Sequence, residues 1–77
     1  MDKVEFGGVV YNARHGGPFD RGSADSYYGR PRDPHYYEAG TSTSHKFEQH
    51  SMTSEEIAAY DAGYDYNEQF GGKKDYD

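Results

Sequence analysis

The strongest structural signal in the chain is a stretch near its C-terminus, residues 53–72, with the sequence TSEEIAAYDAGYDYNEQFGG. It opens with a capping box: the Thr53 hydroxyl can accept from the backbone N–H of Glu56, and the Glu56 carboxylate can accept from the N–H of Thr53. The two glycines at its end are typical of a helix terminus. The stretch therefore predicts an α-helix from about residue 54 to residue 70.

The predicted helix has one face to bury and one acidic face. Its small, aliphatic and aromatic residues recur three and four positions apart and are Ile57, Ala59, Tyr60, Gly63, Tyr64, Tyr66 and Phe70. Its acidic face consists of Glu55, Asp61, Asp65 and Glu68. One interpretation of these carboxylates is a solvated face. The other is a contact surface, because carboxylates one turn apart can imitate the phosphates of a nucleic acid and bind a basic groove.

The chain as a whole has few large apolar side chains to bury. Leu, Ile, Val and Phe together supply 8 of 77 residues, whereas Tyr alone supplies 9, and there is no Leu, Cys or Trp. Such a composition predicts a tyrosine-rich fold, a homo-oligomer, or a chain that orders on a partner. Residues 4–11 alternate with period two and predict a short β segment, in which Gly7 and Gly8 form either a hairpin turn or a bulge.

The middle of the chain gives only weak local signals. Ser23 is a candidate N-cap for one or two helical turns that end at Gly29, and Pro31 and Pro34 favour extended backbone. Residues 38–52, with the polar tract TSTS at 41–44, are interpreted as a flexible connector. We therefore expect one small α+β domain over residues 1–77, with a short N-terminal β segment, an irregular Tyr/Arg-rich middle and one C-terminal helix.

Charge is distributed unevenly along the chain. The net charge of -6 belongs to residues 48–77, because residues 1–47 carry as many bases as acids. Such asymmetry predicts two functional faces. The second face would be the Arg/Tyr-rich segment, since Arg and Tyr dominate the energetics of protein interfaces. Its candidate partner-binding residues are Arg21, Tyr27, Tyr28, Arg30, Arg32 and Tyr36. Alternatively, these aromatic residues form the core and the arginines pair with the chain's own acids.

Several classes of function are not expected. A run of about 18 apolar residues is missing, so we predict no membrane span. The histidines, His15, His35, His45 and His50, lack the spacing of a metal site and are expected to be exposed loop residues. Ser23, Asp25 and His35 lack the surroundings of a hydrolase triad. We therefore expect neither an enzyme nor a cofactor.

Three segments resemble a family of very small, mostly uncharacterised proteins of tailed bacteriophages. They are PFDRGSADSYY at 18–28, PHYY at 34–37, and the spaced Tyr, Gly, Asn, Glu and Lys residues of 60–76. The resemblance implies a phage setting, the cytoplasm of an infected bacterium, and a role in host takeover or counter-defence. It implies no particular activity.

Three hypotheses about function follow. The first is a non-enzymatic accessory protein that binds a host or defence protein through the acidic helix face and the Arg/Tyr-rich segment. The second is a small nucleotide- or RNA-binding protein, either a sponge for a signalling nucleotide or a ribosome-associated factor, that uses Arg21, Arg30, Arg32, Tyr27 and Tyr36. The third is a minor structural component of the virion.

Overall fold

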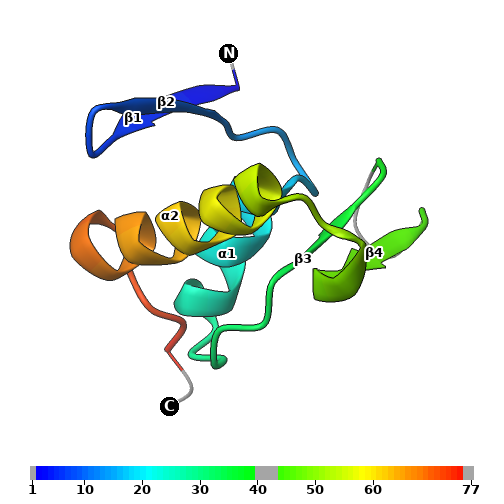
Figure 1. The fold of residues 1–77 in the computed structure, drawn as a ribbon. Helices are drawn as coiled ribbons and strands as arrows, with labels where there is room; N and C mark the ends of the chain where they lie inside the picture. The colour runs from blue at the N-terminus through cyan, green and yellow to red at the C-terminus, as the bar shows by residue number, and fades with distance from the viewer. Residues whose placement is uncertain (1, 40–43, 76–77) are drawn as a thin grey trace.

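The computed structural model describes residues 2–39 and 44–75 and shows an α+β fold, as predicted (Figure 1). In chain order the elements are β1 (Lys3–Phe6), β2 (Val9–Asn12), α1 (Pro18–Tyr27), β3 (His35–Tyr37), β4 (Lys46–Glu48), the 3-10 turn η1 (Gln49–Ser51) and α2 (Ser54–Phe70). Within the described ranges the strands form two separate antiparallel pairs, β1 with β2 and β3 with β4. Figure 1 shows the first pair over one side of α2, and α1 crossing behind α2.

The C-terminal helix has the bounds and the cap that the sequence predicts. The N–H of Thr53 donates to Glu56 Oε1 at 2.8 Å, and the N–H of Glu56 donates to Thr53 Oγ1 at 3.1 Å. At the other end the N–H of Gly71 donates to the Asn67 carbonyl at 2.9 Å. Both ends of α2 are therefore set by local contacts, which is why the sequence was sufficient to locate them.

The middle of the chain is less irregular than predicted, because it contains the helix α1. This helix begins at Pro18, with Gly17 as its N-cap, so the prediction that Ser23 caps a helix was wrong: Ser23 lies in the helix interior. Proline suits the first turn of a helix, where its missing N–H costs no hydrogen bond. The Asp20 carboxylate accepts from the N–H of Gly16 at 2.9 Å and so supports the same turn.

The two helices cross at glycines. A Cβ atom on Gly22 of α1 would collide with the Tyr60 carbonyl oxygen of α2, and a Cβ atom on Gly63 would collide with the Phe19 carbonyl oxygen. The helix backbones therefore touch directly at this point. Phe19 and Tyr60, exposed by only 3% and 0%, flank the crossing and form most of the hydrophobic core.

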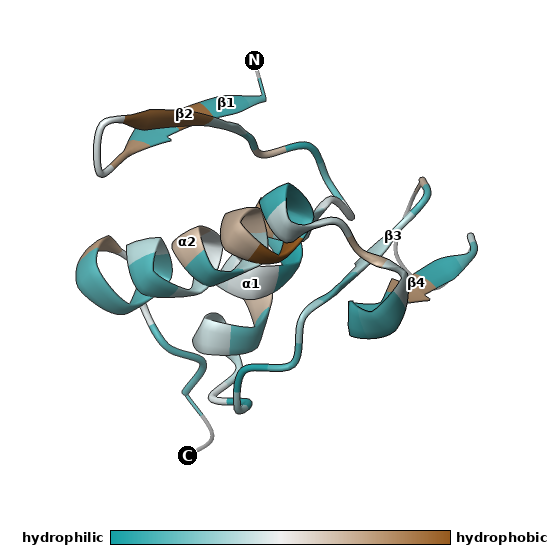
Figure 2. Cartoon of the chain, viewed as in Figure 1, coloured by the Kyte–Doolittle hydropathy of each residue, from teal (hydrophilic) through white to brown (hydrophobic). Residues whose placement is uncertain are grey.

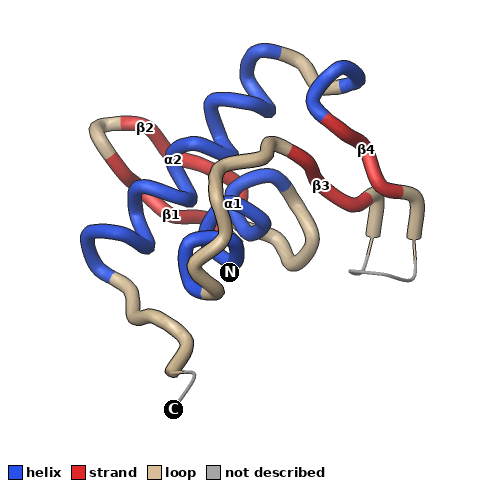
Figure 3. Tube along the Cα trace, turned by 90° about the horizontal axis from the view of Figure 1, so that it is seen from below, coloured by secondary structure: helices blue, strands red, loops and turns tan. Residues whose placement is uncertain are grey.

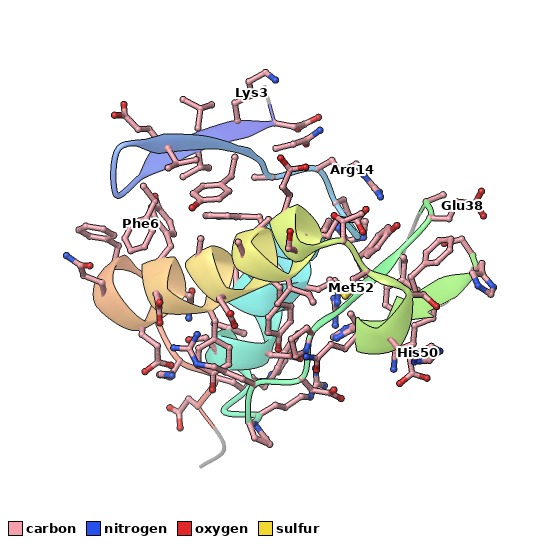
Figure 4. All side chains as sticks on the ribbon, viewed as in Figure 1. Lys3, Phe6, Arg14, Glu38, His50 and Met52 are labelled. Carbon is pink, nitrogen blue, oxygen red and sulfur yellow. The ribbon has the colours of Figure 1, made fainter. Side chains whose placement is uncertain are left out.

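The N-terminal strands form a hairpin that covers a second side of α2. Gly7 and Gly8 have φ values of 61° and 81°, as the two central residues of a type I′ turn require, so the glycine pair is a hairpin turn and not a bulge. Phe6 packs edge-on against Tyr66 of α2, with 5.7 Å between the ring centroids. Figure 4 shows the Phe6 side chain between the hairpin and α2. Figure 2 shows that the valines make β2 the most hydrophobic strand, although Val10 is 62% exposed.

The second pair of strands lies to one side of the helices, as the rotated view in Figure 3 shows. Tyr36 of β3 stands opposite Phe47 of β4, and their rings stack at 4.9 Å. Both β4 and η1 fall within the segment 38–52, which the sequence suggested to be a connector. Of the tract at 41–44, residues 41–43 lie outside the described residues.

Candidate functional site

The two predicted contact surfaces lie side by side, because Arg32 connects them. Its Nη2 donates to Asp65 Oδ1, and its Nη1 lies 3.6 Å from Asp61 Oδ1. The Arg32 guanidinium also lies 4.3 Å from the centre of the Tyr64 ring, within the range of a cation–π contact. The hydrogen bond to Asp65 raises the pKa of Arg32 above its ordinary value. The acidic face of α2 and the Arg/Tyr-rich segment thus form one joined surface.

Glu68 connects the same face to α1 and to the C-terminal segment. Its Oε2 accepts from the Ser26 hydroxyl at 2.6 Å and from Lys73 Nζ. These hydrogen bonds, first that of Lys73 and then that of Ser26, lower the pKa of Glu68. Lys73 Nζ also donates to the Ser26 carbonyl at 3.0 Å. Asp61, Asp65 and Glu68 are therefore each paired with a cation of the same chain, and the acidic face is less negative than the sequence of α2 alone suggests.

Tyr27, Tyr28 and Arg30 form a compact cluster at the end of α1, here called the tyrosine patch. The two rings meet edge to face at 5.0 Å, and the Arg30 guanidinium lies 4.8 Å from the centre of the Tyr28 ring. Each tyrosine is 39% exposed. Arg30 is anchored from below by Asp25, whose Oδ1 lies 3.4 Å from Arg30 Nη1. The two tyrosine rings are thus partly exposed to solvent, and the Arg30 guanidinium is held in place by the buried Asp25 carboxylate.

Tyr36 and Glu55 do not join this surface. Both line a separate cavity of about 430 Å³ near the start of α2, together with Arg14 and Glu56. Figure 4 shows Arg14 above the N-terminal end of α2. Burial, and secondly the neighbouring Glu56, raise the pKa of the Tyr36 hydroxyl. Of the ten predicted contact residues, Tyr36 and Glu55 therefore lie apart from the joined surface, and Arg21 lines the cavity described below.

A buried polar network below the tyrosine patch was not predicted. Asp25 Oδ2 accepts from the Tyr60 hydroxyl, and the Tyr60 oxygen in turn accepts from the N–H of Asp33 at 3.0 Å. Burial, and secondly the hydrogen bond to Asp25, raise the pKa of Tyr60 well above its ordinary value. Tyr60 was expected to be buried from its helical spacing. Its partners are 35 and 27 positions away, beyond the reach of any local pattern.

His35 extends this network and corrects a prediction. It was expected to be an exposed loop histidine, but it lies in β3 and is 6% exposed. Its Nδ1 lies 2.8 Å from the Asp33 carbonyl, and its Nε2 lies 3.2 Å from Arg21 Nε. A carbonyl only accepts and the Arg21 N–H only donates, so these two contacts match a tautomer that donates from Nδ1 and accepts at Nε2. Burial is tolerated because both ring nitrogens have a partner.

A cavity of about 510 Å³ opens beside this network, between α1, the loop that leads to β3, and the β3–β4 pair. Its lining consists of Arg21, Asp25, Arg30, Pro31, Asp33, His35, Tyr37 and Lys46. Across residues 2–39 and 44–75, no group of His, Asp and Glu is arranged to hold a metal ion. In the same ranges neither helix is long and apolar enough to cross a membrane.

Comparisons of this chain with protein-family models, with curated proteins and with solved structures find no match. The joined surface, the buried network and the cavity are therefore the observations from which a function is proposed.

Proposed function

We propose that this chain is a non-enzymatic accessory protein that binds and modulates a host or defence protein in the cytoplasm of a phage-infected bacterium. The observation that supports binding through one surface is the pairing of Arg32 with Asp61 and Asp65, which joins the acidic face of α2 to the Arg/Tyr-rich segment. The phage setting is supported by the sequence resemblance of residues 18–37 and 60–76.

The tyrosine patch has the properties of an interface anchor. Tyr and Arg are enriched among the residues that contribute most to binding free energy. The Arg30 side chain is 54% exposed, although its guanidinium is held by the buried carboxylate of Asp25. Fixing Arg30 in this way lowers the ordering cost that association otherwise imposes on long side chains. We therefore place the centre of the interface at this patch.

The acidic residues beside the patch suit the rim of the same interface. The side chains of Asp61 and Asp65 are 48% and 52% exposed even with Arg32 between them. These carboxylates are therefore accessible to a basic side chain of a partner. Because Arg32 already pairs with them, the interface would not bury them as unpaired charges. Rim charges of this kind change mainly the association rate and its salt dependence.

The test is capture of partners from infected cells, with three versions of the protein as bait. Tyr27→Ala/Tyr28→Ala removes the patch, and Val10→Thr changes an exposed residue of the hairpin as a control. A protein enriched by the wild type and by the control, but not by the double variant, is then purified and its dissociation constant measured. We expect the double variant to weaken binding by about tenfold or more, as hot-spot residues do.

Two outcomes would contradict the proposal. If no protein is enriched by the wild type, the binding function is wrong. If the purified partner binds the double variant as tightly as the wild type, the tyrosine patch is not the interface. Circular dichroism of all three proteins establishes that each bait is folded.

A further inference from the structure

The cavity of about 510 Å³ has a charge opposite to that of the whole molecule. Its size is typical of sites that hold a small organic molecule. Three cations line it from three parts of the chain: Arg21 from α1, Arg30 from the following loop and Lys46 from β4. Against them stand two carboxylates, Asp25 and Asp33. The cavity is thus locally positive in a chain with a net charge of -6.

Arg21 is fixed in this cavity without an acidic partner. Its Nε donates to His35 Nε2 at 3.2 Å, and its guanidinium lies 5.6 Å from the centre of the Tyr37 ring. These contacts leave Nη1 and Nη2 of Arg21 without a hydrogen-bond acceptor among the described residues. These two nitrogens are able to donate to the oxygens of an anion. Arg21 and Lys46 also form no ion pair within that part of the chain, in contrast to Arg30 and Arg32. A half-buried guanidinium without a counter-charge is costly, and an anion would relieve that cost.

Asp25 is already satisfied within the network. One of its oxygens accepts from the Tyr60 hydroxyl and the other lies 3.4 Å from Arg30 Nη1. Asp33 is different, because its N–H and carbonyl bind Tyr60 and His35 while its carboxylate remains at the cavity and is exposed. A carboxylate there repels a long polyanion and can accept a hydrogen bond from a hydroxyl group of a ligand.

We infer that this cavity binds a small-molecule phosphate monoester that also carries hydroxyl groups. A phosphate monoester brings up to two negative charges and three terminal oxygens, which match the three cationic donors Arg21, Arg30 and Lys46. The hydroxyl groups of the same ligand would bind Asp33. This site differs from the nucleotide site expected from the sequence, because Arg32 is held by α2 and Tyr36 lines the other cavity. The site shares Arg30 with the tyrosine patch, whereas its other two cations, Arg21 and Lys46, lie outside that patch.

The test is calorimetric titration of the purified protein with ribose 5-phosphate, and in parallel with ribose, inorganic phosphate and pyrophosphate. We expect saturable binding of ribose 5-phosphate that is tighter than that of the other three compounds. Lys46→Gln removes the charge of an exposed side chain and keeps a residue able to make the backbone pairing of β4 with β3. It should weaken binding by about tenfold, the value of one charge-assisted hydrogen bond. Arg21→Gln should weaken binding further.

The matched control is Lys3→Gln on the hairpin. The Lys3 side chain points away from the helices in Figure 4, so this variant should bind ribose 5-phosphate as tightly as the wild type does. Absence of saturable binding would overturn the inference, as would equal binding by Lys46→Gln and the wild type. Equal or tighter binding of inorganic phosphate or pyrophosphate would overturn the assignment to a monoester. If Arg21→Gln does not fold, amide shifts of the wild type around Arg21 and Lys46 during titration locate the ligand instead.

Discussion

The Tyr60 hydroxyl connects three segments of the chain in the buried network. It donates to Asp25 and accepts from the backbone of Asp33, and so joins α2 to α1 and to the loop before β3. A sequence pattern can predict that a tyrosine at this spacing is buried. It cannot predict which carboxylate the hydroxyl will meet, because that depends on how the two helices cross.

Replacing this hydroxyl should destabilise the protein at neutral pH and change its response to alkali. Tyr60→Phe leaves the buried Asp25 carboxylate with one donor fewer, which costs about 1–3 kcal/mol in the free energy of unfolding. Burial and the bond to Asp25 raise the pKa of Tyr60 above its unfolded value of about 10. Above that pH the unfolded chain loses a proton that the folded chain keeps, so wild-type stability falls as pH rises, by up to about 1.4 kcal/mol per pH unit.

The measurement is denaturant unfolding of wild type and Tyr60→Phe between pH 8 and about 11.5. The difference in stability between them should shrink above pH of about 10, because only the wild type has this proton to lose. Val10→Thr is the control: it changes an exposed side chain of the hairpin and no ionisable group, so its curve should stay parallel to that of the wild type. Parallel curves for Tyr60→Phe would show that Tyr60 is not held protonated by the fold.

At the scale of elements, the crossing of α1 and α2 depends on the absence of two side chains. In an ordinary helix Gly→Ala is favourable by about 1 kcal/mol. At Gly63 the added methyl group would press on the Phe19 carbonyl, which belongs to a helix backbone and cannot rotate away. Gly63→Ala should therefore destabilise the protein by about 1–3 kcal/mol, as overpacking does. Thermal and urea unfolding measure the change.

Gly72→Ala is the matched control, because a Cβ there would meet nothing within 4 Å. Its stability should lie within about 0.5 kcal/mol of the wild type, as for most surface changes. A Gly63→Ala variant as stable as this control would contradict direct contact between the helix backbones.

Elements with local signals were predictable, and elements defined by distant contacts were not. The capping box located the start of α2, and the alternating residues 4–11 located the N-terminal β segment, in which the structure shows a hairpin. The start of α1 was missed because Gly22 is a poor helix former and Ser23 a good cap, so local preference favoured a later start. Gly22 belongs in the helix only because α2 lies against it. The β3–β4 pair is too short to give a periodic pattern.

Over the whole molecule, folding brings the acidic C-terminal part of the chain against the basic residues of the middle. The sequence places the excess negative charge in residues 48–77. It could not show that Arg32 and Lys73 would pair with the carboxylates of α2, because folding decides those contacts. It also placed Tyr36 and Glu55 with residues that the structure puts elsewhere. The electrostatic character of the surface is therefore a property of the fold, not of the helix sequence.

The mixed character of the interior has a consequence for the heat capacity of unfolding. Among the described residues the buried hydrophobic side chains are Phe19, Tyr60 and Ala62, and the buried polar side chains are Asp25, Ser26, His35 and Asn67. Exposure of apolar surface raises the heat capacity, whereas exposure of polar surface lowers it. Scanning calorimetry should therefore give a heat capacity change per residue below the usual range of about 12–15 cal/mol/K, and a value within or above that range would contradict this expectation. A small heat capacity change flattens the curve of the free energy of unfolding against temperature. A protein with so polar an interior should therefore have nearly the same free energy of unfolding at low and at moderate temperatures.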